Sequence, residues 1–197
     1  MTPMKTHQQK MQKIKQAIDK RIAKAQTQKG LVVLITGNGK GKSTSAFGTA
    51  ARATGHGLKV KVCQFIKGSW DCGERDLLEA FDVEFSVMAT GFTWDTQNKE
   101  TDKAACLKVW QFAKKALTDK NVDMLILDEL TYMLNFEYID PQEVYDCLKN
   151  RPNHQHVIIT GRGANKTLIE LADTVSEINN IKHAFDAGIK AQVGLDY

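Results

Sequence analysis

The fold is decided by the stretch Leu31-Val32-Val33-Leu34-Ile35-Thr36-Gly37-Asn38-Gly39-Lys40-Gly41-Lys42-Ser43-Thr44. Its apolar first part predicts a buried strand, and its second part is a glycine-rich turn that carries lysines and leads into a helix. Glycines let backbone N–H groups surround phosphate oxygens, and the N-terminus of the helix attracts negative charge. The stretch therefore predicts a phosphate-binding loop and, with it, a nucleotide site.

The residues of this loop have separate expected tasks. We expect Lys42 to reach the outer phosphates of a triphosphate and the hydroxyl of Ser43 to bind Mg²⁺. The residues expected to contact the nucleotide are Gly37, Asn38, Gly39, Lys40, Gly41, Lys42, Ser43 and Thr44. The loop departs from the usual pattern at Thr36, where a glycine is usual, and Gly37 follows one residue later.

A second apolar run, residues 124–127, ends abruptly in Asp128 and Glu129. In a phosphate-loop protein, an acidic strand end beside the loop supplies the other half of the magnesium site, directly or through water. An isolated Asp-Glu pair after a strand would usually be an exposed turn, but its occurrence together with the lysine-bearing loop favours the metal site. The spacing leaves open which of the two carboxylates contacts the metal.

The composition indicates one soluble globular domain. The chain has 197 residues, of which 42% are apolar and 25% charged, which suits a single compact core. It has no apolar run long enough to cross a membrane and no apolar secretory signal, so a cytoplasmic location is expected. The four cysteines stand far apart without a C-x-x-C pair, and are therefore expected to be reduced thiols rather than disulfides or zinc ligands.

Residues 1–29 form a basic arm that differs from the rest of the chain. They carry a net charge of +7, whereas residues 30–197 carry −3 and are expected to form the single catalytic domain. Apolar residues recur in the arm at spacings of three and four, which predicts an amphipathic helix. They are Met11, Ile14, Ile18, Ile22 and Ala25. Three interpretations stay open: a solvated helix, a nucleic-acid-binding arm, and a lid over an anionic ligand.

Beyond the arm, short strand-like runs alternate with helical patterns. The expected strands are Leu31 to Thr36, Val60 to Ile66, Val83 to Met88, Met124 to Asp128, His156 to Thr160 and Thr174 to Ile178. The expected helices are Ser43 to Thr54, Glu74 to Ala80, Glu100 to Leu117, Pro141 to Lys149 and Lys166 to Leu171, with Asp140 as an N-cap. This order predicts an α/β fold of the P-loop type, in which a mostly parallel sheet has helices on both faces and binds ligands at the carboxyl ends of its strands.

Two further regions follow expected strands on the ligand side of the sheet. The loop after Met88 contains Phe92 and Trp94, which either pack into the core or offer an apolar surface to a large planar ligand. Arg162 follows the strand that ends at Thr160, where it could meet phosphate or form a surface salt bridge.

These motifs together resemble one family. They are residues 36–44, 64–68, 88–94, 127–132, 159–163 and 183–188. In this combination the chain is similar to the ATP:corrinoid adenosyltransferases of the CobA type, over nearly its whole length from Gly30 to Tyr197. The family also has an N-terminal arm, and it often has threonine where Ser43 keeps the hydroxyl.

The resemblance implies transfer of the 5′-deoxyadenosyl group of ATP to Co(I) of a corrinoid, with release of the intact triphosphate. It implies catalytic roles for Lys42, Phe92 and Trp94, and corrinoid binding by Met88, Phe92 and Trp94. The two aromatic residues match those that remove the lower axial ligand of cobalt so that Co(II) can be reduced. In the family the nucleotide lies reversed in the loop, and the displaced Gly37 could accompany that altered grip.

The resemblance also implies partners. The chain has no flavin fingerprint and no iron–sulfur cysteine pattern, so a reduced flavoprotein such as flavodoxin is the expected electron donor. A homodimer is expected, in which the N-terminal helix closes over the partner's active site, and neither nucleic acid nor a membrane is an expected partner. Two other functions fit the loop and the acidic strand end: an ATPase or kinase that releases ADP, and a nucleotide-gated module that binds nucleic acid.

Overall fold

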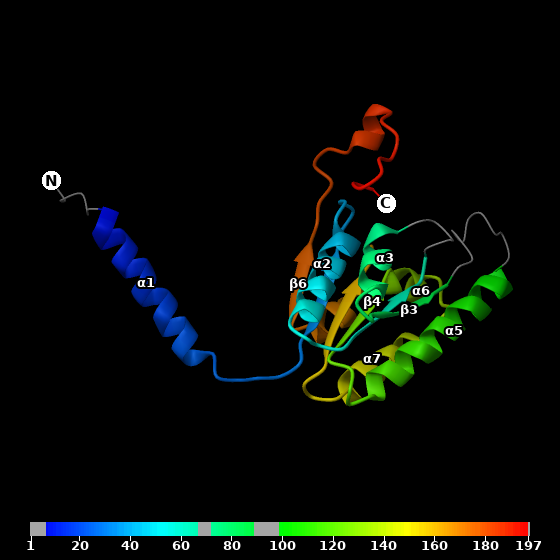
Figure 1. The fold of residues 1–197 in the computed structure, drawn as a ribbon, viewed down its shortest axis with the longest axis horizontal. Helices are drawn as coiled ribbons and strands as arrows, with labels where there is room; N and C mark the ends of the chain where they lie inside the picture. The colour runs from blue at the N-terminus through cyan, green and yellow to red at the C-terminus, as the bar shows by residue number, and fades with distance from the viewer. Residues whose placement is uncertain (1–6, 67–71, 89–98, 197) are drawn as a thin grey trace.

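A six-stranded sheet, parallel throughout, forms the centre of the protein (Figure 1). The computed structural model describes residues 7–66, 72–88 and 99–196. The strands are β1 (Val32–Thr36), β2 (Val60–Gln64), β3 (Glu84–Val87), β4 (Met124–Asp128), β5 (His156–Thr160) and β6 (Thr174–Glu177), in the spatial order β3-β2-β4-β5-β1-β6. All six strands were expected from the sequence, and the α/β fold class is confirmed.

Helices cover both faces of the sheet because the central strands are apolar on both sides. The helices are α1 (His7–Lys24), α2 (Lys42–Gly55), α3 (Gly73–Glu79), α5 (Lys99–Thr118), α6 (Leu130–Asn135), α7 (Pro141–Asn150) and α8 (Lys166–Leu171). Leu125 and Leu127 of β4 pack in the core under α5 to α8, whereas Met124 and Ile126 pack in the core under α2 and α3. A strand that is buried on both faces lacks the alternation of polar and apolar residues. The sequence of β4 lacks this alternation too.

The five helices that were expected after the arm agree with the observed ones to within one residue at each end. Asp140 caps α7 as expected, since its Oδ1 accepts a hydrogen bond of 2.9 Å from the backbone N–H of Gln142. Two short elements were not expected: α6, and a 3₁₀ turn at Ala184–Ala187. Elements of six and four residues are too short to show a hydrophobic period.

The N-terminal helix α1 stands away from the body of the protein (Figure 1). None of its residues is buried, and its apolar stripe is open to solvent, with Met11, Ile14, Ile18 and Ile22 between 46% and 66% exposed. The chain is fixed again at the start of the domain, where the ammonium group of Lys29 pairs with Asp173 and Gly30 N–H donates to the carbonyl of Asn153. The expected amphipathic helix is therefore confirmed, and its apolar face is exposed within one chain.

The other end of the chain is also weakly packed. β6 lies at the sheet edge and all four of its residues are exposed. The residues after it carry several large apolar side chains that are more than half exposed: Ile181, Phe185, Ile189, Val193 and Leu195. All four cysteines are free thiols, as expected. None of the helices in the described part of the chain combines the length and apolar character needed to span a bilayer.

Candidate functional site

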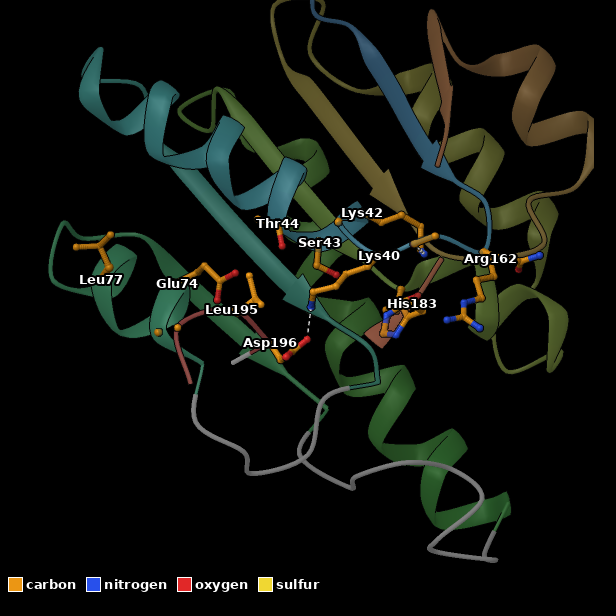
Figure 2. Close-up of a pocket in the computed structure, with 16 residues that line it drawn as sticks. Lys40, Lys42, Ser43, Thr44, Glu74, Leu77, Arg162, His183, Leu195 and Asp196 are labelled. Carbon is orange, nitrogen blue, oxygen red and sulfur yellow. Dashed lines mark hydrogen bonds and ion pairs between the residues drawn. The ribbon is translucent and has the colours of Figure 1, made fainter. Parts of the chain in front are cut away.

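A pocket of about 650 Å³ opens at the carboxyl ends of the strands, where the fold class predicts a ligand (Figure 2). It is lined by the loop residues 38–44, by the start of α3, by the residues after β4 and β5, and by the C-terminal segment. The lining residues outside the loop are Gly73, Glu74, Leu77, Glu129, Arg162, His183, Gly194, Leu195 and Asp196. Four separate parts of the chain thus meet around the predicted phosphate loop.

The irregular glycine of the loop has a local structural reason. Gly37 has φ of 97°, and a Cβ there would lie 2.4 Å from the carbonyl oxygen of Ile178. Ile178 is hydrogen-bonded on both sides, since its N–H donates to Thr36 O (2.9 Å) and its carbonyl accepts from Gly39 N–H (2.7 Å). Glycine is therefore required at position 37, whereas Thr36 is the last residue of β1 and keeps ordinary strand geometry.

Lys42 is held inside the loop. Its side chain is buried, and its Nζ donates a hydrogen bond of 2.7 Å to the carbonyl of Gly39. Burial lowers the pKa of its ammonium group below the ordinary value, Arg162 acts in the same direction, and Glu129 and Asp128 oppose the shift. The lysine is therefore positioned before any ligand arrives, and an anion in the pocket would stabilise its charged form.

The two carboxylates after β4 have different surroundings. Asp128 is fully buried, with Oδ1 accepting a hydrogen bond of 2.7 Å from the Thr160 hydroxyl and Oδ2 lying 3.5 Å from Nε2 of Gln64. Glu129 adopts φ of 61° and lines the pocket, and its N–H donates to the Thr160 hydroxyl oxygen at 2.9 Å. The structure therefore places Glu129 at the pocket and Asp128 one layer behind it.

Arg162 enters the pocket from the turn after β5. Gly161 has φ of 137° and lies so close to α6 that a Cβ there would be 2.0 Å from Thr131 Oγ1. The Thr131 hydroxyl donates a hydrogen bond of 2.7 Å to the carbonyl of Arg162, which fixes the backbone of the turn. The structure shows no ion pair between Arg162 and any residue of the described ranges, so its guanidinium group is available to an anion.

The expected corrinoid residues are only partly described. Met88 is buried just beyond the end of β3, where its N–H donates to the carbonyl of Gln64 at 2.9 Å, and it does not line the pocket. Phe92 and Trp94 lie outside the described residues. The sequence thus remains the basis for their proposed roles.

Several pocket residues were not expected from the sequence. Glu74 and Leu77 come from α3, which follows a strand end on the ligand side, so the order of elements could have indicated them. His183, Leu195 and Asp196 come from the C-terminal segment, which has little regular structure and no periodic signal. Their place became visible only in the folded chain.

The fold and the pocket together define a nucleotide-binding protein of the phosphate-loop type. Residues 28–197 match the family described as ATP:corrinoid adenosyltransferase BtuR/CobO/CobP, and residues 2–22 match a family described as the N-terminal part of cob(I)alamin adenosyltransferase. The chain therefore belongs to the ATP:corrinoid adenosyltransferase family.

Curated relatives agree with that assignment along nearly the whole chain. The chain is 60% identical to a corrinoid adenosyltransferase of Escherichia coli K12, over 97% of each protein. It is 59% identical to the corrinoid adenosyltransferase CobA of Salmonella typhimurium LT2, again over 97% of each. A corrinoid adenosyltransferase of Pseudomonas aeruginosa is 45% identical over 97% of this chain and 95% of its own length.

Proposed function

We propose that the protein transfers the 5′-deoxyadenosyl group of ATP to the Co(I) centre of corrinoids and releases triphosphate. The accepted corrinoids would be cobalamin, cobinamide and cobyrinic acid a,c-diamide, in adenosylcobalamin biosynthesis and corrinoid salvage. The observation that carries the proposal is the lysine-bearing loop at a pocket of about 650 Å³, in a chain 60% identical to a corrinoid adenosyltransferase. The similarity favours this function over an ATPase, a kinase or a nucleic-acid-binding module.

In this reaction the protein must bind the leaving group, which is the triphosphate. Co(I) donates an electron pair to C5′ of the ribose, a Co–C bond forms, the C5′–O bond breaks, and its electrons leave with the triphosphate. Because the metal of the substrate is the nucleophile, no side chain has to act as a base. The tasks of the chain are to orient the two substrates, to exclude water and to stabilise the departing negative charge.

The loop is suited to the last of these tasks. Lys42, the backbone N–H groups of residues 38–44 and Arg162 surround one end of the pocket with positive charge. Donors that are already in place need no reorganisation when charge develops on the triphosphate. We assign the catalytic role of stabilising that charge to Lys42.

Magnesium fits the oxygen atoms beside the loop. In the described part of the chain no three His, Cys, Asp or Glu residues come together as a metal site, but Mg²⁺ needs only one or two protein ligands when phosphates and waters complete its shell. Ser43 and Glu129 line the pocket, and Asp128 lies behind them. We propose Ser43 as a ligand with Asp128 and Glu129 holding bound waters, and the ion would neutralise phosphate charge.

The corrinoid would lie beside the loop that follows β3. We assign its binding to Met88, Phe92 and Trp94, with the two aromatic residues displacing the lower axial ligand so that cobalt can be reduced. The electron would come from a reduced flavoprotein such as flavodoxin. We expect the protein to act in the cytoplasm, without nucleic-acid or membrane partners.

The division of the chain into an arm, residues 1–29, and a catalytic domain, residues 30–197, has a proposed functional meaning. We propose a homodimer in which the helix of one arm covers the pocket of the partner subunit. The exposed apolar stripe of α1 supports this, because a stripe of this kind is usually buried against a partner. Deletion of residues 1–25 should then lower turnover and corrinoid affinity while changing the free energy of unfolding little; unchanged turnover would contradict the proposal.

An anaerobic assay tests the proposed reaction directly. The protein is mixed with Mg·ATP and chemically reduced cobalamin, the visible spectrum is followed for the light-sensitive alkylcobalamin, and the phosphate product is identified. Formation of alkylcobalamin with triphosphate in equal amounts is the expected result. Release of ADP without a new cobalt–carbon bond would overturn the proposal in favour of a kinase or ATPase.

A further inference from the structure

The C-terminal segment, residues 183–196, forms one wall of the nucleotide pocket. His183, Gly194, Leu195 and Asp196 all line the pocket. Figure 2 shows that Asp196 faces Lys40 of the phosphate loop. The segment therefore belongs to the site, although it lies more than 130 residues after the loop in the sequence.

Asp196 brings a negative charge into a pocket built for anions. Its Oδ1 lies 2.6 Å from the Nζ of Lys40, as the dashed line in Figure 2 shows, and its Oδ2 accepts a hydrogen bond of 2.8 Å from the N–H of Gln192. The hydrogen bond from Lys40 lowers the pKa of the Asp196 carboxyl group, with the N–H of Gln192 acting in the same direction. Asp196 is therefore ionised near neutral pH, and its carboxylate forms an ion pair with Lys40 of the phosphate loop.

The segment is weakly held apart from this ion pair. The backbone hydrogen bonds donated by Asp186, Gly188, Ile189 and Leu195 all end inside the segment. Its large apolar side chains are exposed rather than packed on the domain. A wall that is held mainly by an exposed ion pair can move when that pair is broken, because such pairs contribute little to stability.

We propose that Asp196 is a latch that occupies Lys40 until a polyphosphate displaces it. Lys40 carries one positive charge, and two anions beside it repel each other, so a phosphate oxygen and the carboxylate compete for it. A triphosphate carries several negative charges and makes further contacts with Lys42 and the loop N–H groups. It therefore displaces the carboxylate from Lys40 and releases the C-terminal segment. As the triphosphate product leaves, the carboxylate binds Lys40 again and so opposes rebinding of the product.

Binding of inorganic tripolyphosphate to the full-length protein tests the latch. The inference rests on the proposed nucleotide site, but this measurement needs neither corrinoid nor turnover, so it can fail while the adenosylation assay succeeds. Without magnesium, Asp196→Asn should tighten tripolyphosphate binding about two- to five-fold, the range expected for loss of one surface ion pair that competes with the ligand. Asp186→Asn is the matched control, since it removes the same charge from the same segment and should leave the dissociation constant nearly unchanged.

A double-mutant cycle separates the latch from a general charge effect. In a Lys40→Gln background, Asp196→Asn should no longer tighten tripolyphosphate binding. Unchanged or weaker binding by Asp196→Asn alone would overturn the proposal. Equal tightening by Asp196→Asn and Asp186→Asn would overturn it too, because the effect would then be long-range electrostatics.

Hydrogen exchange gives a readout on the unmutated protein, which covers the case of a variant that folds poorly. Amides of residues 183–196 should exchange faster when tripolyphosphate is added, while amides of residues 38–44 exchange more slowly. Slower exchange in both regions would contradict the latch, because it would mean that the segment closes on the ligand instead of leaving it.

Discussion

Strands β4 and β6 reach the same pocket but are built very differently. β4 lies inside the sheet, pairs with β2 and β5, and has all five residues buried. β6 lies at the edge, pairs only with β1 among the described strands, and has all four residues exposed. The first leads to Glu129 and the second leads to the C-terminal segment that carries Asp196.

The contrast indicates a division of labour in the pocket. Groups that must be placed accurately, such as Lys42 and the Asp128–Thr160 pair, are buried and hydrogen-bonded. The group that we propose to move, Asp196, stands on a segment with little packing. Substitutions on the fixed wall should therefore change chemistry and stability strongly, and substitutions on the C-terminal wall should change ligand exchange.

The largest effect is expected at Lys42. Lys42→Ala removes a prepositioned cation from the departing triphosphate and should lower kcat for adenosylation of Co(I) cobalamin by about 10²- to 10³-fold. Lys120→Ala is the matched control. This exposed lysine precedes the amino end of β4, whereas the pocket lies at the carboxyl ends of the strands. A loss of less than about tenfold, or 1.4 kcal/mol of barrier, would remove Lys42 from the catalytic role.

Two glycines test the stability side of the contrast. Gly161→Ala places a methyl group 2.0 Å from Thr131 Oγ1 on the fixed wall and should lower the free energy of unfolding by about 3 kcal/mol. Gly188→Ala also meets a positive φ, of 74°, but has open space around it in the C-terminal segment. Its cost should be about 1 to 2 kcal/mol, from the backbone conformation alone. Urea unfolding measures both, and equal losses would show that the C-terminal wall is packed as firmly as the fixed one.

The aromatic residues after β3 test whether cobalt reduction can be separated from adenosyl transfer. Phe92→Ala and Trp94→Ala should slow adenosylation that starts from Co(II) by about tenfold or more, a barrier increase of about 1.4 kcal/mol. They should largely spare adenosylation when chemically prepared Co(I) is supplied. Paired assays on the same protein preparation measure the two rates, and similar losses in both would contradict a role in removing the axial ligand.

The smallest effect concerns two carboxylates that each bind a lysine. Hydrogen bonding from Lys114 lowers the pKa of Glu143 below its ordinary value near 4.5, with help from the indole N–H of Trp110. Its stabilising contribution is therefore full above pH 4.5 and is lost as the pH falls through the lower, folded-state pKa. Because Glu143 is partly exposed, solvent screening limits this contribution to about 0.5 kcal/mol.

The pKa of the Asp196 carboxyl group is shifted in the same direction as that of Glu143. Its pKa is also lowered, so its pairing with Lys40 is lost as the pH falls through the folded-state value. Over that acid range Glu143→Gln should flatten the dependence of unfolding free energy on pH. Asp196→Asn should flatten it in the same direction but by less, because Asp196 lies on a segment with little packing. The same slope in both variants would mean that the two ion pairs stabilise the fold alike.

The centre of the fold was predictable because β1, β4 and β5 are short apolar runs with clear ends. Residues 124–128 are apolar up to Asp128, so both bounds of β4 could be predicted. β2 ends at Gln64. The expected end was two residues later, at Ile66, because Phe65 and Ile66 are buried and continue the apolar pattern beyond the strand. Burial sets the pattern, but hydrogen bonding sets the bounds.

The site was predictable only where the chain itself carries the chemistry. The loop residues 38–44, Glu129 and Arg162 lie at the pocket as the strand order implied. Asp196 could not be assigned a role, because its task depends on a partner, Lys40, that is distant in sequence. The different settings of Asp128 and Glu129 were also hidden, since they follow from the Thr160 hydroxyl on a neighbouring strand.

The contact between the loop and Ile178 sets the order in which the protein can become functional during synthesis. β1, which begins the loop, pairs only with β5 and β6 among the described strands, and both are made more than 110 residues later. Gly39 is then anchored by the carbonyl of Ile178. A growing chain, or a fragment cut before that residue, contains the whole phosphate-loop motif yet lacks the backbone that shapes it, so nucleotide binding is among the last properties the ribosome's product acquires.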